Sequence, residues 1–289
     1  MMREFDFLTP RSVDEAIALM SDREGDVRIL AGGTDLLLSM REGTITPRAV
    51  MSLKKLPDIR TIEHSKDSGL RLGAMVTLRQ VARSTQIREH YPSLAEAASL
   101  MASEQIRSLA TVGGNLCNAA PSADMAPPLI ALDAVVRLVG LEGERRLPLE
   151  EFFLGPGSTA LDAGELLAEI EVPPTERKTR YMRLTPRAHM DIAVVGVAAG
   201  VQFDNSEVRA ARIVLGAVAP IPLRVRPAEE ALIGKSLTEA AIEAASTIAA
   251  EECSPISDLR GSDWYRRRMV GVLVRRALRS LSETVLAAA

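Results

Sequence analysis

Two glycine turns carry most of the chemistry that this 289-residue sequence offers. The first, Ala31-Gly32-Gly33-Thr34-Asp35, lies between a short strand pattern and a short apolar helix pattern. The second is Thr111-Val112-Gly113-Gly114-Asn115. Glycine lets backbone N–H groups approach a ligand with no Cβ in the way, and a helix N-terminus favours anions. Two such turns facing one diphosphate would hold it without lysine or magnesium.

Polar side chains beside the turns fit the same kind of ligand. Thr34 can donate to a phosphate, Asn115 can donate and accept, and Asp124 can accept from a ribose hydroxyl or a ring N–H. A Gly-Gly pair on its own is more often only a turn, and neither motif is G-x-G-x-x-G or a Walker loop. The residues therefore indicate a dinucleotide-like anion held between two parts of the chain, and they do not support a nicotinamide Rossmann domain.

Composition narrows the classes of partner. The formal charge of −3 and the pI of about 5.8 leave no basic excess of the kind that marks nucleic-acid binders, so small molecules or protein surfaces are expected instead. The longest apolar run, residues 192–201, is about half of the roughly twenty residues that a spanning helix needs. The N-terminal residues lack the pattern of a secretory signal. A cytoplasmic protein is expected.

Metal and catalytic constellations are not expected. The cysteines, Cys117 and Cys253, are far apart and form no CxxC, zinc or iron–sulfur pattern, so the chain is expected to hold no metal of its own. The three histidines, His64, His90 and His189, stand in no metal or triad spacing. No catalytic residue is assigned, and Cys117 is expected to be a buried, inert side chain.

Element patterns divide the chain into three units, 1–54, 55–174 and 175–289. The first is a small α/β unit with a capping box at Ser12 and a helix over 13–21. The second is an α+β unit with a hairpin over 60–73, a capping box formed by Thr77 and Gln80, a helix over 92–101, and strands over 134–139 and 166–172. A polar, proline-broken stretch at 173–178 marks the next boundary.

The third unit is predicted to place its strands before its helices. Three strands are expected over 181–184, 192–203 and 208–218, with helices over 238–252 and 263–284. The last helix carries six arginines and an apolar stripe that includes Val270 and Leu273. Its basic face is expected to be solvated by default, and a subunit-docking surface is the alternative. Asp191 is expected to be structural, by capping or by pairing with Arg187.

The sequence resembles a known family in five places. These are residues 29–37 (ILAGGTDLL), 106–115 (IRSLATVGGN), 120–134 (APSADMAPPLIALDA), 187–193 (RAHMDIA), and 254–262 (SPISDLRGS) with Tyr265 and Arg266. Together they resemble the FAD-binding medium subunit of the molybdenum hydroxylases, the xanthine dehydrogenase and carbon monoxide dehydrogenase family. The resemblance covers nearly the whole chain. The cysteine-rich insertion of the relatives that reduce aromatic thioesters is missing, which disfavours that subgroup.

The resemblance implies an α+β, vanillyl-alcohol-oxidase (PCMH) type FAD-binding fold. Two N-terminal FAD-binding subdomains would precede a C-terminal α+β domain with a three-stranded antiparallel sheet and helices. Dissociable FAD would lie extended between the first two units, with no covalent attachment. By this resemblance, both glycine loops would contact the pyrophosphate, and Asn118 and Asp124 would contact the flavin or the ribose. Leu167 would pack on FAD, and Arg183 would lie near the isoalloxazine. The cofactor-binding set is Leu30, Ala31, Gly32, Gly33, Thr34, Asp35, Thr111, Gly113, Gly114, Asn115, Asn118, Asp124, Leu167 and Arg183.

The function implied by the resemblance is electron transfer within a complex. A 2Fe-2S small subunit would receive electrons from a molybdopterin large subunit and pass them through FAD in this chain to an external acceptor, in a heterotrimer or a dimer of heterotrimers. The alternative is a freestanding FAD-dependent oxidase or dehydrogenase of the same fold that acts on a small organic substrate. In the third unit, His189 is its lone candidate base. An interaction protein that has lost its flavin is disfavoured, because both glycine loops are intact.

Overall fold

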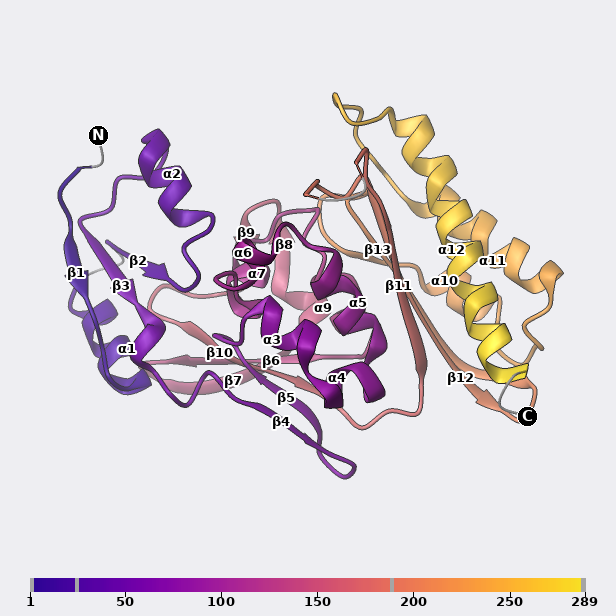
Figure 1. The fold of residues 1–289 in the computed structure, drawn as a ribbon, viewed down its shortest axis with the longest axis horizontal. Coiled ribbons are helices and arrows are strands. Elements are labelled where there is room, and N and C mark those ends of the chain that lie inside the picture. Colours follow the sequence, from indigo (N-terminus) through magenta and orange to yellow (C-terminus); the bar gives the residue numbers. More distant parts are fainter. Residues whose placement is uncertain (1–2, 24–25, 188–189, 287–289) are drawn as a thin grey trace.

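The computed structural model describes residues 3–23, 26–187 and 190–286, and these contain three larger sheets in succession and a small two-stranded sheet within residues 153–159 (Figure 1). The first sheet is parallel with the order β1-β3-β2. Its strands are β1 (Asp6–Leu8), β2 (Val27–Leu30) and β3 (Ala49–Ser52), and its helices are α1 (Val13–Ser21), α2 (Leu36–Glu42) and the 3₁₀ turn Leu53–Lys55. Ser12 Oγ accepts from Glu15 N at 3.1 Å, which confirms the predicted start of α1. The predicted capping box is incomplete, because Glu15 Oε2 accepts from Arg11 N at 2.7 Å and not from the N–H of Ser12.

The second sheet is antiparallel and has the strand order β4-β5-β10-β6-β7. Its strands are β4 (Ile62–Ser65), β5 (Gly69–Gly73), β6 (Val135–Gly140), β7 (Gly143–Pro148) and β10 (Leu166–Val172). Between them lie α3 (Leu78–Arg83), α4 (Thr85–His90), α5 (Pro92–Leu100), α6 (Glu104–Arg107), α7 (Val112–Cys117), α8 (Ala126–Ala131), α9 (Leu149–Phe152), β8 (Phe153–Gly155) and β9 (Ser158–Thr159). The capping box of Thr77 and Gln80 is confirmed at the start of α3.

The third sheet has four strands, so the predicted count of three is wrong. It runs β11 (Lys178–Leu184), β12 (Val195–Asp204), β13 (Glu207–Gly216) and β14 (Leu223–Arg224), followed by α10 (Arg226–Glu230), α11 (Glu239–Glu252) and α12 (Asp263–Leu286). The missed strand, β14, pairs only with Val214 and Leu215. Two residues are too few to show an alternating pattern in the sequence.

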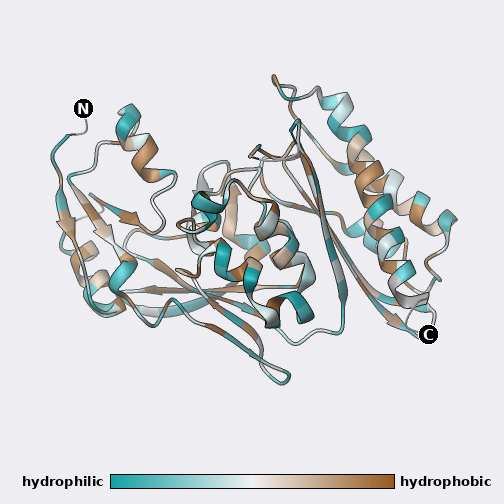
Figure 2. Cartoon of the chain, in the orientation of Figure 1, coloured by the Kyte–Doolittle hydropathy of each residue, from teal (hydrophilic) through white to brown (hydrophobic). Residues whose placement is uncertain are grey.

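Packing places the third sheet between two helical layers. Its own helices α11 and α12 cover one face, and the apolar stripe of α12 is buried as predicted, with Val270 at 0% and Leu273 at 4% exposure. In Figure 2, teal and brown alternate along α12, as expected for a helix with one apolar face. Tyr181, Ala198 and Val214 of the third sheet belong to the same buried core as the second sheet and its helices. No helix within the described ranges is both long and apolar enough to cross a membrane.

Candidate cofactor site

The two glycine loops, residues 31–35 and 111–115, lie next to each other although they are far apart in sequence. A Cβ built on Gly32 would lie 2.3 Å from the carbonyl oxygen of Leu109, just before the second loop. A Cβ on Gly114 would lie 3.7 Å from Cβ of Ala31 in the first loop. Only residues without side chains allow this approach at Gly32. The structure therefore brings together the two motifs that the sequence singled out.

The first loop has a run of free backbone donors. The N–H groups of Gly32, Gly33, Thr34 and Asp35 have no hydrogen-bond partner among the residues that the structure describes. The carbonyl of Gly33 accepts from Leu37 N at 3.2 Å, which starts α2, and Gly33 itself has a φ of +79° that favours glycine. Four successive free donors next to a helix start can bind an anion.

The second loop differs, and the prediction that it offers a set of free N–H donors is wrong. Its residues 112–117 form helix α7, and Thr111 is the N-cap, because its Oγ1 accepts from Gly114 N at 3.0 Å. The N–H groups of residues 112, 113 and 115 donate to Val76 O, Ala74 O and Thr111 O, at 2.9, 2.9 and 3.0 Å. These amides hold α7 in place.

Gly113 and Thr111 are tied to the strand–turn segment before α3. A Cβ on Gly113 would lie 2.6 Å from Cβ and 2.7 Å from the carbonyl oxygen of Ala74. Thr111 forms an isolated β-bridge with Thr77, and it is only 2% exposed. The second glycine pair thus permits close packing of α7 on the second sheet, which positions the loop beside residues 31–35.

Asp124 and Arg183 meet in a buried ion pair that joins the loop before α8 to the third sheet. Arg183 Nη1 donates to Asp124 Oδ2 at 2.8 Å, and both side chains are almost fully buried. Arg183 also donates to the carbonyl of Leu100. The hydroxyl of Tyr181 donates to Asp124 Oδ1 at 2.6 Å. Both carboxylate oxygens thus have partners within the chain.

The protonation of this trio follows from burial. Burial raises the pKa of Asp124, although the Arg183 guanidinium and the Tyr181 hydroxyl oppose the shift. Burial and the Asp124 carboxylate raise the pKa of Tyr181 well above its ordinary value, which keeps its hydroxyl protonated as a donor. Sequence reasoning missed Tyr181. The sequence could have indicated Tyr181, because it stands two residues before Arg183 on the same strand and alternate residues of a strand share a face.

The other predicted contact residues differ in their surroundings. Asn118 Nδ2 reaches Asp35 Oδ1 at 3.5 Å, and Asn115 Oδ1 accepts from Met125 N at 3.4 Å. Leu30 and Leu167 are buried, the latter within the core of the second sheet. The exposed side chains of Leu37 and Leu109 flank the glycine loops. Free N–H donors beside apolar side chains suit a ligand that joins a diphosphate to aromatic rings.

The histidines, Cys117 and Asp191, which the sequence analysis also considered, lie in different surroundings. His64 and His90 stack with ring centroids 4.4 Å apart, while His189 lies outside the described residues. Burial raises the pKa of the Cys117 thiol to about 12, as expected for an inert side chain, although the residue as a whole is only partly buried. Asp191 accepts from Arg187 Nε at 3.1 Å, which confirms the predicted pair. No group of three or more His, Cys, Asp or Glu side chains suited to a metal ion occurs in the described part of the chain.

The arginines of α12 are mostly engaged within the chain. Arg266 is 3% exposed and donates to the carbonyls of Val194 and Ala217 and to Asp258, so a solvated face is wrong for this residue. Arg267 donates to two carbonyls at the end of α11. Arg275 and Arg279 pair with Glu243 and Glu239 of α11. These contacts fix α12 against α11 and leave less free charge for a partner.

Comparison with known proteins gives consistent matches along the chain. Residues 3–175 match a family model described as the FAD binding domain in molybdopterin dehydrogenase, and residues 180–281 match one described as the CO dehydrogenase flavoprotein C-terminal domain. The chain is 32% identical over 290 residues to the xanthine dehydrogenase FAD-binding subunit of Escherichia coli O157:H7, with 98% of each chain covered. It is 35% identical over 276 residues to the carbon monoxide dehydrogenase medium chain of Hydrogenophaga pseudoflava, with 95% of this chain and 96% of that one covered.

Solved structures agree with these relatives. Carbon monoxide dehydrogenase from Hydrogenophaga pseudoflava superposes with a TM-score of 0.93 at 34% identity, covering 96% of this chain and 97% of that chain. Quinoline 2-oxidoreductase from Pseudomonas putida 86 superposes with a TM-score of 0.92 at 28% identity, covering 98% and 99%. The similarity therefore extends through all three sheets.

Proposed function

Because the chain belongs to the FAD-binding medium subunits of the molybdopterin dehydrogenases, the xanthine and carbon monoxide dehydrogenase family, we propose that it binds FAD between its first two sheets and carries electrons out of a molybdenum enzyme complex. It is the flavoprotein subunit of a multi-subunit oxidoreductase. The proposed electron donor is a 2Fe-2S subunit, which is reduced by a molybdopterin subunit. The proposed acceptor is an external oxidant.

The observation that carries the proposed cofactor placement is the run of free N–H groups at residues 32–35, beside the second glycine loop. These donors would bind the pyrophosphate of FAD, with the hydroxyl of Thr34 as a further donor. The other predicted contact residues would surround the pyrophosphate on either side. These are Leu30, Ala31, Thr111, Gly113, Gly114, Asn115 and Asn118. Leu167 of β10 would pack against the cofactor.

The Asp124–Arg183 pair would define the flavin end of the cleft. FAD, when bound, supplies the capacity to accept and release electrons singly or in pairs. Tyr181 and Arg183 hold the Asp124 carboxylate from both sides, so the negative charge of Asp124 is balanced within the chain. No general acid or base is needed for electron transfer, which agrees with an assignment of no catalytic residue in this chain.

The organisation around the site is also part of the proposal. We place FAD-binding subdomains at 1–54 and 55–174 and a C-terminal domain at 175–289. The separate sheets and the two family matches, which end at residue 175 and start at 180, support these boundaries. The proposed assembly, with iron–sulfur and molybdopterin subunits, is a heterotrimer or a dimer of heterotrimers, and the similarity to a medium chain of carbon monoxide dehydrogenase supports a complex of several subunits. A cytoplasmic location agrees with the free thiols of Cys117 and Cys253.

Isolation of the tagged full chain from its native cells tests the proposed function. Metal analysis and a visible spectrum of the product are the two readouts. The expected product contains two further chains together with molybdenum, iron and dissociable FAD. A yellow protein that purifies alone and is reduced directly by a small alcohol or amine would contradict the electron-transfer function and favour the freestanding oxidase.

A further inference from the structure

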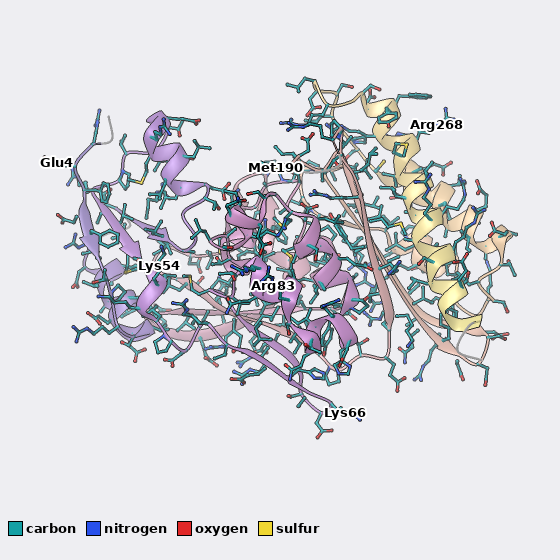
Figure 3. The ribbon with its side chains drawn as sticks, viewed as in Figure 1. Glu4, Lys54, Lys66, Arg83, Met190 and Arg268 are labelled. Carbon is teal, nitrogen blue, oxygen red and sulfur yellow. The ribbon has the colours of Figure 1, made fainter. Side chains whose placement is uncertain are left out.

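A second site lies at the surface of the middle unit, around the start of α3. It is a pocket of about 400 Å³. Its lining residues are Arg60, Thr77, Arg79, Gln80, Arg83 and Ser108. In Figure 3, Arg83 lies in the middle of the molecule, well away from Lys66 at the tip of the β4–β5 hairpin and from Arg268 on α12. None of these residues belongs to the proposed FAD-binding set.

The pocket carries more positive charge than its surroundings balance. Arg79 Nε and Arg83 Nη2 both contact Glu104 Oε1, at 3.1 and 2.9 Å, and Arg107 Nη2 contacts the other oxygen at 3.1 Å. Arg60 donates to the carbonyl of Lys54 and has no ion pair in the described part of the chain. Three guanidinium groups therefore share the Glu104 carboxylate and Arg60 adds a fourth positive charge beside them, although the chain as a whole has a net charge of −3.

The excess charge is available to a ligand from solution. The side chains of Arg79 and Arg83 are 45% and 63% exposed, so their remaining N–H groups can turn toward the pocket. Like charges held close together repel, and a bound anion relieves that repulsion. Guanidinium groups match the oxygens of a phosphate with paired hydrogen bonds.

We propose that this pocket is a binding site for a phosphate group, either inorganic phosphate or the terminal phosphate of a nucleotide, held by Arg60, Arg79 and Arg83. The site is separate from the FAD cleft, but the two share a segment. Ser108 lines the pocket, and the carbonyl of the next residue, Leu109, faces Gly32 in the first glycine loop. A ligand in the pocket therefore contacts the chain one residue away from the residue that packs on the first glycine loop.

Titration calorimetry on the FAD-loaded full chain tests this proposal, with inorganic phosphate and ADP as separate probes in a phosphate-free buffer. We expect one site per chain. The double variant Arg60→Gln/Arg83→Gln should weaken binding at least about tenfold, because each lost charge-assisted bond contributes more than 1 kcal/mol. The control Lys66→Gln/Arg268→Gln removes the same charge from two exposed, distant positions and should bind as the parent does.

The pattern of results identifies the source of the phosphate group. Equal binding of both probes supports a site for phosphate itself, whereas binding of ADP alone supports a nucleotide. Absence of binding by both probes, or equal loss in the two double variants, would overturn the proposal. Loss of FAD from a folded Arg60→Gln/Arg83→Gln variant would also overturn it, because the pocket would then be part of the cofactor site. Thermal unfolding of each variant shows whether it is folded.

Discussion

In the first glycine loop the N–H groups of residues 32–35 have no partner within the described chain, whereas in the second loop the N–H groups of residues 112–115 are all bonded within it. Both loops contain a Gly-Gly pair, yet one pair leaves donors free and the other lets a helix pack against Ala74. Glycine therefore serves packing of a helix in the second loop, while the first loop keeps free donors for the pyrophosphate that we propose it binds. Variants that separate stability from FAD affinity test this difference.

The largest expected effect is on stability, at Gly113. Alanine favours a helix over glycine by about 1 kcal/mol, but a Cβ here would lie 2.6 Å from Cβ of Ala74. Overpacking of this kind costs up to about 3 kcal/mol, so Gly113→Ala should lower the free energy of unfolding by about 2 kcal/mol net. Urea denaturation measures the change.

Gly155 offers the matched control for that variant. A Cβ at Gly155 has open space around it, and this residue does not have a positive φ. Gly155→Ala should change the free energy of unfolding by no more than about 0.5 kcal/mol. Equal stability of Gly113→Ala and Gly155→Ala would contradict the packing role of the second loop.

The next effect is on FAD affinity, at Thr34. The variant Thr34→Glu places a carboxylate beside the free donors, where it should repel the pyrophosphate and weaken FAD binding about tenfold, or about 1.4 kcal/mol. Stability should be nearly unchanged, because Thr34 bonds only to Asp35 within the described chain. Thr44→Glu adds the same charge beyond α2 and should keep the parent's affinity. Fluorescence titration with FAD would disprove the placement if both variants bound equally.

A smaller effect is expected at the cap of α7. Thr111→Val removes the acceptor for Gly114 N and should cost about 1 kcal/mol of unfolding free energy. FAD affinity, measured under conditions where the variant is folded, should change little. A loss of affinity larger than the loss of stability would show that the Thr111 hydroxyl contacts the cofactor directly, and the contrast between the loops would then be weaker.

The smallest expected signal is the reactivity of Cys117, which lies in α7 behind the second loop. A pKa of about 12 leaves roughly one thiol in ten thousand ionised at about pH 8, and the thiolate is the reactive form. Native protein should therefore incorporate almost no iodoacetamide at this residue, as measured by mass spectrometry. Rapid labelling without unfolding would indicate that α7 opens readily and is not the fixed wall described above.

Local signals in the sequence were sufficient for much of the fold. The Ser12 and Thr77 caps and the hairpin of β4 and β5 depend on neighbouring residues, and the structure confirms them. The second loop was misjudged because its partners, Ala74 and Val76, are more than thirty residues away. Nothing near Gly113 in the sequence reveals that contact. The same limit applies to β14, whose pairing with β13 depends on tertiary context.

The candidate site shows the same limit: the sequence indicates which residues could matter, but not which residues they contact. The sequence identified Asp124 and Arg183 separately, but their ion pair and the hydroxyl of Tyr181 become visible only when β11 packs against the loop before α8. Arg266 was assigned to a basic face, yet it is buried against backbone carbonyls of the third sheet. Residue types in the sequence indicate candidate polar side chains, and only the fold shows which of these side chains already have partners within the chain.

Amide hydrogen exchange with and without FAD tests the central claim most directly. In the stripped chain the amides of residues 32–35 should exchange fast, because they have no partner, and those of residues 112–115 should be protected. On FAD binding, the first set should become protected while the second changes little. Unchanged fast exchange at residues 32–35 in the FAD-loaded protein would contradict the assignment of the first glycine loop as the pyrophosphate site.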